Sequence, residues 1–530
     1  MDSLPGLVFL ALLGLLLAPL GVAIARVGAG VASGVGFESG GPLQIEWPAL
    51  ARTLAVGAVV GIGATLVAVP LAWAVRRRGW SAGAWLLVVP ILPSYLTFAG
   101  WGVVRDPGTW LGDAVADLAQ GEPWRWLPAA LGTTLAILAM VLWAAPLASL
   151  ILVASLRGVS DAAFDALRLE ARPTLTGRMR YRATQLGLMG QALAVSAGAA
   201  ALVAMGSAVP LHLAQIKTVG LRAWIELDQR PLETQWVAAT RCWPLLVVAA
   251  IAAAVVVRAI RRASPDSGDE VTGSRLGPGR WVGVFLVVSV GVPLGLLVSE
   301  AGGVGHVRLM GSLHADAIGG SLGVAMATGV CGAAIAAGCA RWALVRGWLG
   351  WGVRLLMGVL VAAALSPGVV IGWAYAWAWS GFDAPEALRE SIAPVVGAHV
   401  ARFGALAAAI GAWVALTEPR ALAEMIRLDG ASGWRGWLGA VVPRQLPALV
   451  GAGLLVAALS FQEIESAVMV QPAGVQSFPR VVLAHLHFFR TRDLAACAAW
   501  ATLIGGGFAA IGVGLIGLSR ARGRGATRAR

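Results

Sequence analysis

The chain has 530 residues, of which 13% are charged and 58% are hydrophobic, whereas a soluble protein carries about a quarter charged residues. This composition excludes an ordinary soluble enzyme. Sixty-nine glycines and 23 tryptophans are typical of closely packed transmembrane helices with aromatic anchors at the membrane interface. The formal charge of +13 comes almost entirely from arginine, because Lys217 is the only lysine. Since the arginines stand between apolar runs, we interpret the charge as membrane topology and predict no nucleic-acid binding.

Runs of about 18 or more mainly apolar residues predict roughly twelve membrane-spanning helices. In the first half of the chain they lie near residues 7–25, 54–75, 82–104, 127–155, 186–209 and 236–257. In the second half they lie near residues 281–298, 319–340, 354–377, 395–416, 446–469 and 494–518. The first run has no cation before it and is long enough to span, so we expect a retained helix rather than a secretion signal.

The most polar and turn-rich stretch is 258–280, which contains Ser264-Pro265-Asp266 and a Gly-Pro-Gly turn. It predicts a cytoplasmic linker between a first half (1–257) and a second half (281–518), and a basic tail (519–530) follows. Arginine collects in the loops after the second and fourth spans of each half, in the linker and in the tail. The positive-inside rule places these segments in the cytoplasm, and an even number of spans places both termini there.

The two halves contain an internal repeat. Matches at an offset of 268 join Thr53-Leu54 to Ser321-Leu322, Gly61 to Gly329, and Arg78-Gly79-Trp80 to Arg346-Gly347-Trp348 (329 − 61 = 348 − 80 = 268). A second offset joins Arg168-Leu169 to Arg427-Leu428 (427 − 168 = 259). Because six spans separate the halves, the repeats are parallel. We therefore predict an all-α polytopic membrane protein with about twelve transmembrane helices in two parallel six-helix repeats.

Each half has one long cytoplasmic connection between its fourth and fifth spans, at residues 160–185 and 418–447. In the second connection Pro419 favours the start of a helix and Gly430 favours its end. We expect a short helix outside the bilayer in each connection.

The segment Glu424-Met-Ile-Arg-Leu-Asp-Gly430, with Pro443 downstream, resembles the EAA loop of binding-protein-dependent ABC import permeases. In that family the loop forms a coupling helix that docks in a cleft on the ATP-hydrolysing subunit. The resemblance implies this role for Asp165, Ala166, Leu167 and Ala171 in the first half and for Glu424, Met425, Ile426, Gly430 and Pro443 in the second. The alternative is that the two short helices only cap the bundle at the membrane surface.

The resemblance implies a type I importer fold in a bacterial inner membrane, without enzyme activity or a cofactor of its own. The partners it implies are cytoplasmic ABC ATPase subunits, as a homodimer, and an extracytoplasmic solute-binding protein. The fused halves, with Ser460-Phe-Gln-Glu-Ile-Glu465 and Met469-Val-Gln-Pro-Ala-Gly474, are similar to ferric iron permeases. Permeases for thiamine, sulfate or polyamine are the alternatives within the family.

Glu463 and Glu465 are acids near the end of a predicted span. At about 1.5 Å per residue, Glu463 lies roughly 24 Å along the helix from Pro447, near the outer side of the bilayer. There the two acids would line the translocation path or face the binding protein. The alternative is a solvated helix end. Met205 and Ser207 take the equivalent places in the first half, so the acids belong to one half only.

A phosphate-binding loop requires glycine directly before its lysine, but Lys217 follows Ile216, so the chain has no standard phosphate-binding loop. If it is an ABC component, the ATPase must be another subunit. His485 and His487 point about 200° apart on a helix, so we predict polar loop or interface residues and no metal site. The four cysteines show no metal or redox spacing and are interpreted as small core residues. An ion-coupled secondary transporter is the alternative from a different class, and it would use buried acids.

Overall fold

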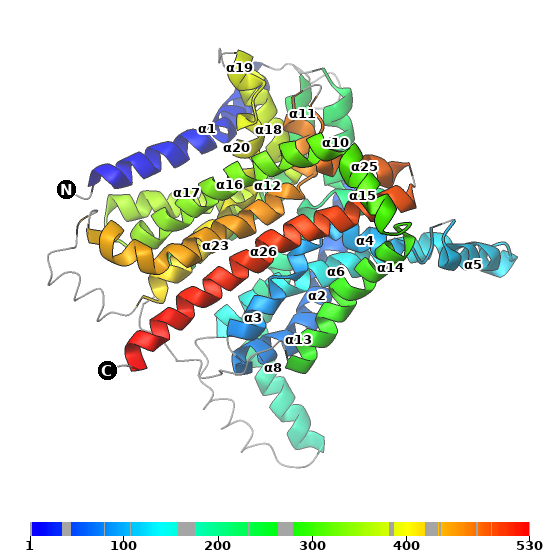
Figure 1. Cartoon of the computed structure of the whole chain (residues 1–530), viewed down its shortest axis with the longest axis horizontal. Helices are drawn as coiled ribbons and strands as arrows, with labels where there is room; N and C mark the ends of the chain where they lie inside the picture. The colour runs from blue at the N-terminus through cyan, green and yellow to red at the C-terminus, as the bar shows by residue number, and fades with distance from the viewer. Residues whose placement is uncertain are drawn as a thin grey trace.

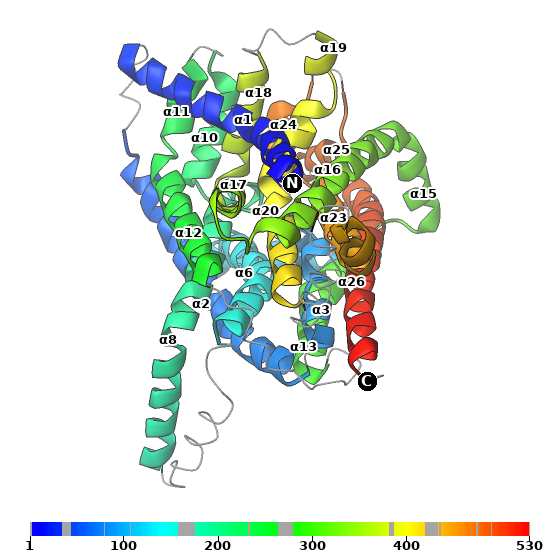
Figure 2. The same cartoon turned by 90° about the vertical axis from the view of Figure 1, so that its left-hand side faces the viewer.

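A computed structural model of the chain describes residues 3–33, 44–78, 80–106, 108–156, 175–231, 234–262, 279–380, 386–418, 433, 436–472, 475–488 and 490–528. All regular structure within these ranges is helical, and ten of the helices there are long and apolar enough to cross a membrane. Figures 1 and 2 show the long helices packed side by side in one bundle. The chain is an all-helical, multi-pass membrane protein.

The helices of the first half are α1 (Ser3–Ser33), α2 (Trp47–Arg78), α3 (Trp80–Leu86), η2 (Val89–Ile91), α4 (Ser94–Gly102), α5 (Trp110–Ala119), η3 (Glu122–Trp124), α6 (Leu127–Ser155), α8 (Leu175–Gly206), α9 (Val209–Leu213), α10 (Val219–Gln229), α11 (Gln235–Thr240) and α12 (Trp243–Arg262). The helices of the second half are α13 (Gly279–Leu286), η6 (Val287–Gly291), α14 (Val292–Glu300), α15 (Val304–Leu313), α16 (Ala315–Trp342), α17 (Trp348–Leu365), α18 (Gly368–Ser380), α19 (Glu386–Arg389), α20 (Ala393–Leu416), η7 (Trp437–Val441), α23 (Val442–Phe461), α24 (Glu465–Val470), α25 (Phe478–His487) and α26 (Thr491–Arg528).

Several predicted spans are interrupted in the structure. Residues 82–104 form α3, η2 and α4 rather than one helix, since Pro90 and Pro93 have no N–H to donate and restrict the residues before them. Pro367 separates α17 from α18 in the same way. Residues 236–257 divide between α11 and α12, and the apolar stretch Trp243–Arg258 of α12 is shorter than the ten spans. The prediction of about twelve continuous spans therefore differs from the structure at these breaks.

The predicted domain boundaries fall partly inside helices. α26 continues to Arg528, so the helix runs on beyond residue 518, while its apolar span ends at Ser519. α12 ends at Arg262 and α13 begins at Gly279, so the predicted linker starts and ends with helix, and its residues 263–278 lie outside the described ranges.

The two halves pack their core helices in the same way. α2 lies along α6 and α8, and α16 lies along α20 and α23. A Cβ on Gly61 of α2 would approach the carbonyl oxygen of Ala197 to 2.5 Å, and a Cβ on Gly329 of α16 would approach that of Gly453 to 2.9 Å. Small residues at such crossings let two membrane helices approach closely. Gly61 and Gly329 are the pair that the first sequence offset matches.

A second equivalent contact lies at one end of each core. The Thr53 hydroxyl of α2 accepts a 3.0 Å hydrogen bond from the backbone N–H of Val219, the first residue of α10. The Ser321 hydroxyl of α16 accepts a 2.9 Å bond from the N–H of Phe478, the first residue of α25. The hydroxyl residues are related by the offset of 268, and the two donors by the offset of 259 (478 − 219 = 259). In each of the two hydrogen bonds, the acceptor is therefore related to its counterpart by the first offset and the donor by the second.

The first long helix of each half packs against the other half. α1 lies against α17 and α18, and α14 lies against α4, so the halves are interlocked (Figure 1). The outward faces of the peripheral helices carry exposed apolar side chains, such as Leu15 of α1 and Leu66 of α2. Such faces are costly in water but are satisfied by lipid.

Candidate functional site

Most residues of the predicted coupling helices are not placed by the structure. Asp165, Ala166, Leu167 and Ala171, and likewise Glu424, Met425, Ile426 and Gly430, lie outside the described residues. Pro443 is described, and it is the second residue of α23. Proline fits there because the N–H groups of the first helical turn have no partner within the helix.

Glu463 and Glu465 lie in and just after a turn that ends the span. α23 stops at Phe461, and α24 begins at Glu465, so the assumption of one helix running through Glu463 is wrong. Both residues are buried, with exposed fractions of 8% for Glu463 and 4% for Glu465. Burial excludes the alternative of a solvated helix end.

Arg402 of α20 holds the two buried acids together. Its Nε lies 3.4 Å from Oε1 of Glu463, and its Nη2 donates a 2.9 Å hydrogen bond to Oε2 of Glu465. Its Nη1 donates to the carbonyl oxygen of Ser366 at 2.8 Å. A buried charge cluster offsets its desolvation only when its hydrogen-bonding groups are satisfied. Two nitrogens of this guanidinium donate hydrogen bonds, and the third lies within ion-pair distance of Glu463. We call Arg402, Glu463 and Glu465 the arginine–glutamate cluster.

Backbone donors complete the cluster. Oε1 of Glu463 accepts hydrogen bonds from the N–H of Ser466 at 2.9 Å and from its hydroxyl at 3.0 Å. Oε1 of Glu465 accepts from the N–H of Ala208 at 2.6 Å and from that of Val209 at 3.2 Å, where α9 begins. Ala208 and Val209 belong to the first half of the chain. Glu465 therefore joins the two halves directly.

A mostly apolar recess with a few polar side chains leads to this cluster. A cavity of about 70 Å³ is lined by His399, Ser460 and Glu463, among others. The His399 Nδ1 lies 2.8 Å from the Ser460 hydroxyl, which in turn lies 3.2 Å from the Thr328 hydroxyl. A cavity of this size has room for water, which these polar side chains can bind. The arrangement can therefore bring water, or a small polar solute, next to a charged contact between the halves.

Arg402 was not singled out from the sequence, although a signal was present. It stands alone among apolar residues in the predicted span 395–416. An arginine at such a position is costly unless it pairs with an acid, and it marks a functional or structural pair. The sequence alone does not show that the partners are Glu463 and Glu465, because more than sixty residues separate them from Arg402 (463 − 402 = 61).

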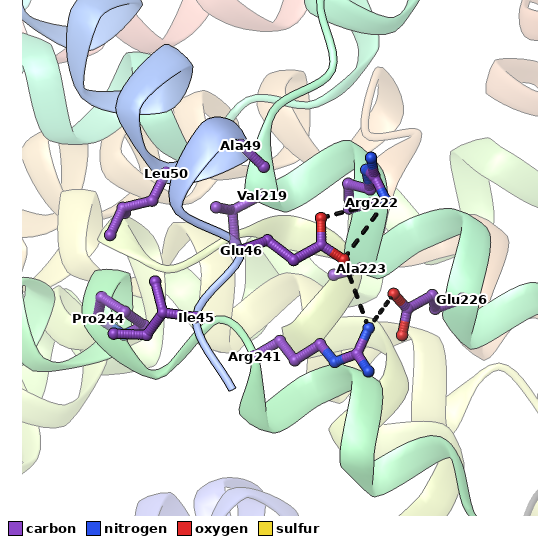
Figure 3. A pocket seen from close by; sticks show the side chains of 10 residues that line it. All are labelled: Ile45, Glu46, Ala49, Leu50, Val219, Arg222, Ala223, Glu226, Arg241 and Pro244. Carbon is purple, nitrogen blue, oxygen red and sulfur yellow. Dashed lines mark hydrogen bonds and ion pairs between the residues drawn. The ribbon is translucent and has the colours of Figure 1, made fainter. Parts of the chain in front are cut away.

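A second charged cluster lies within the first half, and Figure 3 shows it around a small cavity of about 20 Å³. Glu46, just before α2, lies 3.1 Å from a nitrogen of Arg222 on α10 and 3.6 Å from a nitrogen of Arg241. Arg241 follows α11 and also pairs with Glu226 of α10. We call these four residues the first-half ion cluster. It fastens α10 to the start of α2 and to the end of α11.

His485 and His487 of α25 face different partners, as their spacing predicts. His487 Nε2 lies 2.8 Å from Nε2 of His212 on α9, and so forms a contact between the halves. The His485 ring meets the ring of His314 edge to face, with centroids 5.8 Å apart. Burial lowers the pKa of both His485 and His314 below the ordinary histidine value. Both imidazoles are therefore neutral near pH 7.

Comparisons of this chain with protein-family models, with curated proteins and with solved structures gave no match. The class of protein is therefore defined by its fold and its buried polar groups. It is a polytopic helical membrane protein whose interlocked halves meet at a buried, charged contact.

Proposed function

We propose that the protein is the permease subunit of an ATP-binding-cassette importer, in which two parallel six-helix repeats enclose the translocation path. The observation that carries the proposal is the duplicated packing. The Thr53 to Val219 and Ser321 to Phe478 hydrogen bonds are equivalent. The Gly61 and Gly329 crossings are equivalent as well. Two equivalent halves around one interface suit a path that opens alternately to either side.

The arginine–glutamate cluster supports a role at the outer end of this path. It lies after α23, a span that begins next to the predicted coupling loop, so it sits at the opposite end of that span from the loop. It contacts the first half through Ala208 and Val209. Opening the path outward would separate the halves here. We infer that the cluster holds the two halves together at the outer end of the path while that end is closed.

The predicted coupling loops 160–185 and 418–447 would transmit the movements driven by ATP hydrolysis to the membrane helices. The first of these runs into α8, which begins at Leu175, and the second runs into α23, which begins at Val442. In Figure 2 the N-terminal ends of α8 and α13 and the C-terminal end of α26 all point toward the lower end of the picture, with the end of α8 apart from the other two. The arginine pattern assigns this end to the cytoplasm. There a homodimer of ATPase subunits would dock, while a solute-binding protein delivers cargo at the opposite face of a bacterial inner membrane. Both termini would be cytoplasmic.

Ferric iron is the cargo that we propose, from the resemblance around Ser460 to Glu465. The buried acids beside the cavity provide negative charge where a cation would pass. Thiamine, sulfate and polyamine are the other cargoes to test, and sulfate is the least compatible with two carboxylates near the path.

An ion-coupled secondary transporter is the second candidate function. Glu463 and Glu465 are buried, and Glu463 lines a cavity together with His399. Buried ionisable groups of this kind carry protons or sodium ions in such transporters. No ATPase would then be needed, and the predicted coupling helices would only cap the bundle.

The test is purification of the tagged protein in mild detergent with mass spectrometry of its partners, beside Glu424→Arg and Gly430→Pro. Glu386→Arg is the matched control, since Glu386 is an exposed acid on α19, outside the predicted coupling loops. We expect an ATPase subunit to co-purify with the parent and the control and to be lost from the two loop variants. The importer proposal fails if no ATPase co-purifies and the protein alone, in liposomes, moves solute down an ion gradient.

A further inference from the structure

Three side chains with metal-binding atoms converge at one end of the second half. His314 lies between α15 and α16, His485 lies on α25, and Cys497 lies on α26. Their ligand atoms, one from each residue, all lie within 4.8 Å of one another. A sequence motif does not reveal this group, because His314 lies far from His485 and Cys497 in the sequence.

The group is buried and incompletely satisfied. His485 is 8% exposed and Cys497 is fully buried. Within the part of the chain that the structure describes, the Nε2 atoms of His314 and His485 are buried and have no hydrogen-bond partner. A buried imidazole nitrogen without a partner is unfavourable, and such an atom in a native protein points to a missing water or ion.

The first-half ion cluster occupies the equivalent place in the other repeat. Glu46 and His314 are separated by the first sequence offset (314 − 46 = 268), and Glu226 and His485 by the second (485 − 226 = 259). The same two offsets relate the hydrogen bonds of Thr53 and Ser321, which fix the neighbouring helices. The two sites therefore correspond in space as well as in sequence.

A cation fills the first-half site. Figure 3 shows the guanidinium of Arg241 between the carboxylates of Glu46 and Glu226. Thr234 and Trp243 match Thr491 and Trp500 at one offset (491 − 234 = 500 − 243 = 257), and this register puts Ala498 opposite Arg241. Alanine supplies no charge. The second-half site thus has two imidazoles and a thiol where the first half has two acids, and the residue that matches Arg241 there is the uncharged Ala498.

We propose that His314, His485 and Cys497 bind one transition-metal ion, with Zn²⁺ as the test ion, in the place that a guanidinium takes in the first half. Imidazole and thiolate ligands suit zinc and related soft ions, whereas magnesium and calcium require oxygen ligands. Ligand atoms around one zinc ion lie about 3.5 Å apart, so small side-chain rotations close the site. Binding displaces the thiol proton of Cys497 to solvent, and water takes the open fourth position.

The bound ion would fasten α25 to α16 and α26. The first-half ion cluster fastens α10 to α2 and α11 in the same manner. Asp493, one turn before Cys497, lies 3.0 Å from His306 Nε2 and adds negative charge next to the site. This inference is independent of the transported cargo and of ATPase coupling, because it concerns a fixed ion outside the proposed path.

The experiment uses the purified full-length protein in detergent, stripped with a chelator and titrated with Zn²⁺ and, separately, with Co²⁺. We expect one zinc per chain and a thiolate-to-cobalt charge-transfer absorption. Cys497→Ser and His485→Asn should each weaken zinc binding by more than about 100-fold, since altering a residue behind the ligands already costs 10- to 100-fold. The matched controls are Cys331→Ser, in the neighbouring α16, and His487→Asn, on the same helix. Both should bind zinc like the parent.

The proposal is overturned if the parent protein binds no zinc, or binds cobalt without the thiolate absorption. It is also overturned if binding survives in Cys497→Ser but is lost in His487→Asn, which would assign the metal to the pair of His212 and His487. The parent cobalt spectrum decides the point even if a variant fails to fold. A rise in melting temperature with zinc in the parent, absent in Cys497→Ser, would show that the ion fastens the helices.

Discussion

The same turn in the two halves has different chemistry. In the first half, the residues after α8 are Ser207, Ala208 and Val209, which present a hydroxyl and two backbone N–H groups. In the second half, the residues after α23 include Glu463 and Glu465, which present carboxylates. The halves share their core packing, yet at this turn one supplies the donors and the other the acceptors.

This difference shows how two halves with similar core packing can form a specific interface. Acids in both turns would bring four carboxylates together, and like charges at close range would keep some of them protonated or push the halves apart. The neutral turn instead solvates Glu465 with its backbone, and Arg402 pairs with both carboxylates and offsets one of their two negative charges. The result is a contact that forms in one arrangement of the halves. If this contact, rather than general packing, fixes how the two halves are placed, changes to its charged residues should have the largest effects.

The largest effect is expected from Arg402→Met. The change leaves Glu463 and Glu465 buried without a cation, and breaking a buried ion pair from one side costs about 3 to 5 kcal/mol. We expect a large fall in melting temperature, measured by tryptophan fluorescence in detergent. Arg402→Lys is the control, since it keeps the charge but loses the fork of donors, and it should fall in between. A melting temperature equal to that of the parent in Arg402→Met would show that the cluster is not stabilised as described.

The sequence predicts the all-helical, multi-pass class that the structure shows. Apolar runs located most helices, and Gly61 with Gly329 and Thr53 with Ser321 identified positions that turned out to make equivalent contacts. The helix breaks at Pro90, Pro93 and Pro367 were missed, because a hydropathy window averages over a proline and merges the segments on either side.

The candidate sites could be predicted only in part. Glu463 and Glu465 stood out as acids beside a span, but their burial depends on α23 ending at Phe461, which apolar periodicity does not mark. The group of His314, His485 and Cys497 could not be predicted, because its members lie far apart in sequence and only the folded structure brings them together. Pairing across distant helices is set by packing, and a single sequence carries little information about it.

A smaller effect is expected from Glu465→Gln, which keeps the shape of the side chain but removes its charge. The bonds from Arg402 and from the start of α9 become weaker, and hydrogen bonds to charged groups contribute about 1.5 to 3 kcal/mol. Labelling of Ser207→Cys by a water-soluble maleimide should be faster in the Glu465→Gln background, because the halves separate there more often. Glu386→Gln on the exposed α19 is the control. Unchanged labelling would argue against an opening at this turn.

The equivalent hydrogen bonds at Thr53 and Ser321 should respond equally. Thr53→Val and Ser321→Ala each remove the acceptor for one buried backbone N–H, and we expect each to lower the free energy of unfolding by about 1 to 2 kcal/mol. Two matched melting curves measure this. A loss in only one variant would mean that the two contacts look alike but differ in strength, which would weaken the case for equivalent halves.

The smallest effect is expected from Glu46→Gln in the first-half ion cluster. The Glu46 side chain is 30% exposed and that of Arg222 is 47% exposed, so water screens their pairing. Exposed ion pairs contribute about 0 to 1 kcal/mol, and the loss should shrink further when salt is raised. The loss in Glu465→Gln should be nearly independent of salt, because that carboxylate is buried. Equal salt dependence in the two variants would contradict the distinction between a screened cluster within one half and a buried one between the halves.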